Sequence, residues 1–169
     1  MDFEEQLATG IEGVVVVMGI GNPLRGDDAA GSLAARRIES LPGVCVIDAQ
    51  DVPEEFLVRV VDQQPDTVVL IDSVDMDSAP GSVAFLDRDQ VARYWPSTHR
   101  MPLGLLMEVL EQETYALVIG IGIQPAHTEL LKPLSSAVAA SVARVAEMLN
   151  GALGRGRTTA QGVEGEVPA

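Results

Sequence analysis

Continuous apolar runs rich in β-branched residues recur along the chain, and they are the feature that most limits its fold. The clearest are VVVVMGI at 14–20, VCVIDA at 44–49, DTVVLIDSV at 66–74 and YALVIGIGIQP at 115–125. Such runs are typical of strands buried on both faces, as in parallel sheets. Segments with helical spacing separate them. We therefore predict an α/β fold, a three-layer sandwich with a mostly parallel twisted sheet of about five strands flanked by helices on both faces.

The remaining segments predict the helices and one short strand. Asp2 and Glu5 have the spacing of a capping box for a helix over 2–9, and Pro53 is placed to open a helix over 53–63. Ala30, Leu33, Ala34, Ile38 and Leu41 recur at helical spacing after the first run. Further helices are expected at 90–95, within 97–113 and over most of 127–153, and a short strand within 78–87.

The chain has 169 residues, of which 47% are hydrophobic, and this suits one domain with a sizeable core. We place that single domain at residues 1–153. The stretch GRGRTTAQGVEGEVPA at 154–169 has few side chains that could pack, so we expect a disordered tail.

The turn after the first run, GIGNPLRGDD, decides which ligand this edge of the sheet can take. A dinucleotide site requires G-x-G-x-x-G after its strand, but here Gly19 and Gly21 are followed only by Gly26. Asp27 and Asp28 then put two negative charges where a phosphate would lie, which disfavours a nucleotide. A capping role for one aspartate at the next helix remains an open alternative.

Ligands bind open α/β sheets beyond the carboxyl ends of the strands, so polar residues there are candidates. Asp72 ends the run at 66–74, although an Asx turn would also explain it. His99 lies in the polar segment STHRMPL, and His127 follows the last run. Two carboxylates and one imidazole suit a divalent ion such as nickel, zinc or iron, without identifying the metal.

The composition of the chain disfavours several other functional classes. The net charge of −14 disfavours nucleic acid and anionic membranes as partners. No apolar run reaches the ~18 residues of a membrane helix. Cys45 is the only cysteine, and its apolar neighbours predict a buried thiol. With the acidic start MDFEEQLATG, these features lead us to expect a cytoplasmic protein.

The motifs together resemble a known family. GIGNPLRGDDAAG, LIDSVDMDSAPG, STHRMPLGLLMEVL and GIGIQP resemble, in order, the blocks of nickel-iron hydrogenase maturation endopeptidases, and most resemble the formate-hydrogenlyase-type branch and its archaeal relatives. The resemblance covers roughly residues 14–150. Ala29 stands where the family often has glycine.

The resemblance implies an endopeptidase that removes the C-terminal extension of a hydrogenase large-subunit precursor after nickel insertion. It assigns the catalytic and metal-contacting roles to Asp28, Asp72 and His99. Gly19, Gly21, Asn22 and Asp27 would form the supporting turn. Nickel would come with the substrate, and no organic cofactor and at most weak oligomerisation are expected. A non-proteolytic nickel-dependent chaperone, or another metal-dependent hydrolase on the same fold, remains an alternative.

Overall fold

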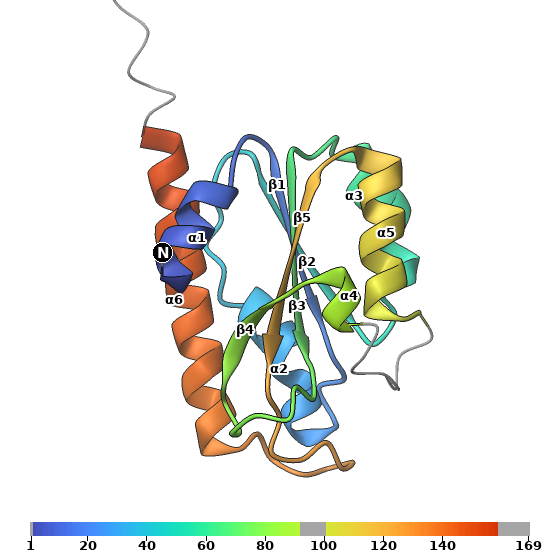
Figure 1. Cartoon of the computed structure of the whole chain (residues 1–169), viewed down its shortest axis with the longest axis vertical. Coiled ribbons are helices and arrows are strands. Elements are labelled where there is room, and N and C mark those ends of the chain that lie inside the picture. The colour runs from blue at the N-terminus through green and yellow to red at the C-terminus, as the bar shows by residue number, and fades with distance from the viewer. Residues whose placement is uncertain (1, 92–100, 159–169) are drawn as a thin grey trace, which may run out of the picture.

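The computed structural model describes residues 2–91 and 101–158, and within them one five-stranded sheet (Figure 1). Its order is β2-β1-β3-β5-β4. The strands are β1 (Val15–Ile20), β2 (Val44–Gln50), β3 (Thr67–Ser73), β4 (Val83–Leu86) and β5 (Leu117–Ile123). Only β4 among them pairs antiparallel, with β5. The predicted mostly parallel sheet is confirmed.

Helices cover both faces of the sheet, so the predicted three layers are also confirmed (Figure 1). One core lies under α1 (Phe3–Gly10), α2 (Ala30–Ala35) and α6 (Ser136–Thr158). The other lies under η2 (Pro53–Phe56), α3 (Leu57–Asp62), α4 (Arg88–Val91) and α5 (Leu103–Thr114). Val15 and Val17 of β1 enter the first core, and Val16 and Met18 enter the second. This explains why β1 is apolar at successive positions.

Several boundaries differ from the sequence prediction. The capping box of α1 is confirmed, because Asp2 and Glu5 each accept a hydrogen bond from the other's backbone N–H. However, α2 ends at Ala35, before Ile38 and Leu41. The last helix begins at Ser136 and continues to Thr158, so residues 154–158 are helical where we expected a tail. The rest of that tail, 159–169, lies outside the described residues.

Cys45 is only half-buried, so the prediction of a buried thiol was wrong. It lies in β2, which is an edge strand and is less covered than β1 or β3. The Arg59 guanidinium lies 4.0 Å from its Sγ atom.

The strand order creates a switch point between β1 and β3. The chain leaves β1 through α2 to reach β2 on one side, and returns through α3 on the other face to β3, which pairs with the opposite side of β1. Crevices at such points, beyond the carboxyl ends of the strands, are where open α/β sheets bind ligands. In the described part of the chain, no helix is long and apolar enough to cross a membrane.

Candidate active site

Two glycines let the chain leave β1 sharply. A Cβ atom on Gly19 would lie 2.5 Å from Ala35 Cβ, so its absence allows α2 to pack directly on the strand. Gly21 has a φ of +139°, and a side chain there would collide with the backbone carbonyl of Asp28. The residue at 21 must therefore be glycine for the turn to fold back over the end of β1.

Asn22 stabilises the turn through hydrogen bonds of both its backbone and its side chain. Its backbone N–H donates to Asp28 Oδ2 at 2.9 Å, and its side-chain Oδ1 accepts from the backbone N–H of Leu24 at 2.9 Å. Its Nδ2 also donates to Asp51 Oδ2, after β2, at 3.3 Å. Asn22 thus fixes the carboxylate of Asp28 to the end of β1.

Asp28 is not a helix cap. It lies within the short 3-10 helix η1 (Gly26–Ala29), and neither η1 nor α2 has a side-chain cap. The carboxylate is buried and points back to the turn. No described residue other than Asn22 donates a hydrogen bond to it. Its second oxygen therefore remains available to a ligand.

Asp72 lies on β3, the strand that pairs with β1. It is buried near the carboxyl end of β3, and its Oδ1 accepts from the backbone N–H of Ser73 at 2.8 Å. Gly31, in the first turn of α2, lies against the backbone oxygens of Ile20 and Ile71. The segment that carries Asp28 therefore spans the ends of β1 and β3, and both predicted carboxylates lie at the switch point.

Asp27 faces the opposite way and ties the turn to the chain after β5. Its carboxylate accepts hydrogen bonds from the backbone N–H groups of Ala126 (2.8 Å), His127 (3.4 Å) and Ser135 (2.7 Å), and from the Ser135 hydroxyl (2.8 Å). Burial raises the pKa of Asp27, but these hydrogen bonds outweigh it and hold the pKa below its ordinary value. Asp27 is therefore ionised, and its hydrogen bonds hold η1, which also carries Asp28, against the chain that follows β5.

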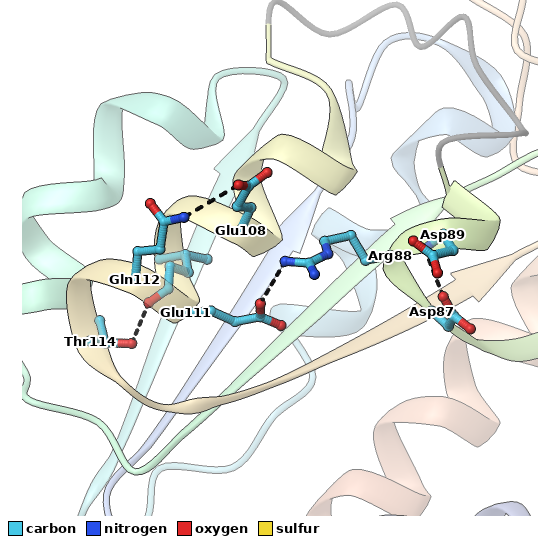
Figure 2. A network of polar contacts seen from close by, with 8 residues as sticks. Asp87, Arg88, Asp89, Glu108, Glu111, Gln112 and Thr114 are labelled. Atoms are coloured by element: carbon cyan, nitrogen blue, oxygen red, sulfur yellow. Dashed lines mark hydrogen bonds and ion pairs between the residues drawn. The ribbon is translucent and has the colours of Figure 1, made fainter.

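His99, the third predicted ligand, lies outside the described residues. Within the described ranges, no three His, Cys, Asp or Glu side chains gather as a metal site. The flanks of the 92–100 segment are described, and Figure 2 shows how they are joined. Arg88 of α4 pairs with Glu111 of α5 at 3.1 Å, and Gln112 donates to Glu108 at 3.3 Å. The ion pair holds together the two helices between which His99 occurs.

A pocket of about 440 Å³ opens between those helices. Its walls combine the apolar Val91, Pro102 and Leu105 with the charged Arg88, Asp89 and Glu108. In the sequence, its lining residues come from both sides of the 92–100 segment.

Buried polar atoms without a hydrogen-bond partner mark the same edge of the sheet. In the described part of the chain they include Arg25 Nε, Ser73 Oγ and His127 Nδ1. Arg25 belongs to the turn after β1, Ser73 ends β3, and His127 follows β5. Native proteins leave few such atoms, and those that remain tend to occur at functional sites. His127 Nδ1 lies 3.9 Å from the Glu129 carboxylate, and in the described part of the chain the two are not joined by a third side chain of the metal-binding kind.

The sequence analysis missed two residues whose hydrogen bonds stabilise the loops at the carboxyl ends of the strands. Gln124 is buried just beyond β5, where its Oε1 accepts from Met76 N–H at 2.6 Å and its Nε2 donates to Asp75 Oδ1 at 3.1 Å. It could have been noticed within GIGIQP. Ser135 binds Asp27 twice, but its sequence context gives no signal of that role. Asp75 remains an exposed loop residue; the Gln124 hydrogen bond lowers its pKa.

Comparison with known proteins gives concordant family, sequence and structural similarities. The family model described as "HycI: Hydrogenase maturation protease" matches residues 30–152, a range that begins just after Asp28. The hydrogenase 3 maturation protease of Escherichia coli K12 is 32% identical over 154 residues, which cover 89% of this chain and 98% of that protein.

Solved structures extend the similarity to the fold. The [NiFe] hydrogenase maturation protease HycI from Thermococcus kodakarensis KOD1 has a TM-score of 0.80 and 28% identity, covering 89% of this chain and 97% of its own. A crystal structure of the hydrogenase 3 maturation protease has a TM-score of 0.75 and 31% identity, over 85% of this chain and 94% of that one.

Proposed function

Since this chain belongs to the hydrogenase maturation protease family, we propose that it removes a C-terminal extension from a nickel-iron hydrogenase large-subunit precursor after nickel insertion. The chain is an endopeptidase, and its substrate is a hydrogenase precursor. The proposal adds which subunit is cut and that nickel controls the cut. Processing in the cytoplasm suits a chain with a single cysteine.

The observation that supports the site is the burial of two carboxylates near the carboxyl ends of neighbouring parallel strands. Asp28 lies in η1, which follows β1, and Asp72 lies near the end of β3; each accepts a hydrogen bond from a backbone N–H group. Carboxylate oxygens bind divalent ions, and a histidine would complete a mixed oxygen and nitrogen set. We assign that third position to His99. The nickel ion would arrive as part of the substrate.

Peptide hydrolysis at this edge requires a water molecule and a group that moves its proton. As water attacks the carbonyl carbon, a carboxylate takes one proton and delivers it to the amide nitrogen while the C–N bond breaks. We propose Asp28 and Asp72 as the carboxylates for this role. Polarisation of the carbonyl or the water by the substrate's nickel is the second route, in which Asp28, Asp72 and His99 would contact the nickel ion.

Incubation with precursor tests the function directly. Nickel-loaded and nickel-free large-subunit precursors are each mixed with the purified protein, and the products are weighed by mass spectrometry. We expect loss of the C-terminal extension from the loaded precursor only. Equal cleavage of both forms would show that nickel loading does not control cleavage. Tight binding without cleavage of either form would support the chaperone alternative.

A further inference from the structure

Three exposed leucines lie in two loops at the carboxyl edge of the sheet. Leu24 belongs to the turn after β1, and Leu130 and Leu131 belong to the loop between β5 and α6. Their exposed fractions are 60%, 59% and 77%. We refer to these three residues as the leucine rim. Clustered exposed apolar side chains on a folded protein mark contact surfaces more often than single ones do.

The backbone holds the leucine rim together. Leu131 N–H donates to the Leu24 carbonyl oxygen at 2.7 Å, which joins the two loops directly. Leu131 also has a φ of +61°, a left-handed conformation that is unfavourable for a non-glycine residue. The fold therefore keeps Leu131 in an unfavourable backbone conformation while its side chain remains mostly exposed to water.

The leucine rim shares its supports with the candidate site. Asn22 accepts from Leu24 N–H through its side chain and donates to Asp28 through its backbone. On the other loop, Asp27 binds Ala126 and Ser135, on either side of Leu130 and Leu131. Figure 1 shows both loops together at the carboxyl ends of the strands. A protein that presents a peptide bond to Asp28 would meet this surface.

We propose that the leucine rim is the docking surface for the hydrogenase precursor, and that it takes an apolar segment of that protein next to the bond that is cut. This rests on the proposed function. The rim is continuous with the edge where the precursor must be held for cleavage. Burial of these three exposed leucine side chains against an apolar segment removes apolar surface from water and supplies affinity.

The test compares two pairs of substitutions with the same charge change. Leu24→Glu/Leu130→Glu alters the rim. Tyr115→Glu/Leu117→Glu alters two residues that are 93% and 54% exposed at the start of β5, on the opposite edge of the sheet. Cleavage kinetics and binding affinity are measured with nickel-loaded large-subunit precursor, and circular dichroism and thermal unfolding confirm that both variants fold.

We expect the rim variant to raise KM and the dissociation constant by about ten-fold or more, with kcat within about two-fold of wild type and the control variant unchanged. Unchanged KM and affinity in the rim variant, or equal losses in both variants, would overturn the proposal. A wild-type dimer that only the rim variant dissociates would also overturn the proposal, because the rim would then bind a second copy of the chain.

The same measurements separate docking from the proposed function. If the wild-type protein binds the precursor without cutting it, the proposed function fails, while the measured affinities still test docking. If the wild-type protein does not bind the precursor, the docking proposal fails as well.

Discussion

At the scale of single residues, Asp27 and Asp28 are neighbours in sequence but hold different parts of the molecule. Asp28 points to the turn after β1, and Asp27 points to the chain that follows β5. The sequence shows an acidic pair but not this division, because the donors to Asp27 come from residues 126–135. The position of Asp72 was easier to predict, since a strand's end can be read from its own apolar run.

Replacement of Asp27 tests its supporting role. Asp27→Asn turns one acceptor oxygen into a donor facing N–H groups, so we expect a loss of about 3 kcal/mol in the free energy of unfolding at pH 7. The folded-state pKa lies below its ordinary value of 3.8, so the stabilisation is present above that pH and is lost as pH falls through the folded pKa. Denaturant titrations should show that the difference in the free energy of unfolding between wild type and variant is smaller at pH 3 than at pH 7. An equal difference at the two pH values would contradict this.

The two histidines provide a matched test of the third ligand. His99→Ala should lower kcat/KM by about 10³-fold while thermal unfolding is unchanged, because it removes the nitrogen group from the proposed triad. His127→Ala changes the same residue type and should leave cleavage within a few-fold of wild type. The assignment fails if the two variants show the reverse pattern.

Cys45 should not take part in the reaction. It is half-buried near the start of the edge strand β2, where it pairs with Val16 of β1, whereas the candidate site lies beyond the carboxyl ends of the strands. Cys45→Ala should cost about 1 kcal/mol or less of stability and no activity. Loss of cleavage by this variant with its circular dichroism spectrum unchanged would instead indicate a thiol protease.

At the scale of secondary structure, apolar spacing predicted burial better than it predicted helix ends. Ile38 and Leu41 pack on the core beneath α6 although α2 ends at Ala35. The last helix begins at Ser136 because the preceding residues form the loop that binds Asp27. The first difference arises because a side chain can reach the core from a loop as well as from a helix.

The ion pair between α4 and α5 should matter more for activity than for stability. Arg88 and Glu111 are about half and two-fifths exposed, so their pair contributes ~1 kcal/mol or less. Yet it fixes the two helices on either side of the segment with His99. We expect Arg88→Glu to lower kcat/KM several-fold with a small change in melting temperature. The reversed pair Arg88→Glu/Glu111→Arg should recover activity; failure to recover would exclude the pair as the cause.

At the scale of the whole molecule, the composition of the proposed triad Asp28, Asp72 and His99 predicts how tightly the protein binds metal. Two carboxylates and one imidazole without a cysteine should bind nickel weakly in the free protein, because thiolates on the precursor compete better. We expect less than one equivalent of nickel or zinc after purification without chelators, measured by elemental analysis. One equivalent that survives EDTA dialysis and is needed for cleavage would identify a resident metal.

The hydrogen bonds of Asp27 also have a consequence for the order in which the chain folds. They join residue 27 to partners as far along the chain as Ser135, a separation of 108 positions. Contacts so distant in sequence form late, because the intervening chain must first be ordered. During synthesis, the turn that carries Asp28 lacks its rear support until β5 and the start of α6 have left the ribosome. A chain that ends before Ser135 therefore lacks these bonds behind the turn that carries Asp28, and we expect it to be inactive in cleavage.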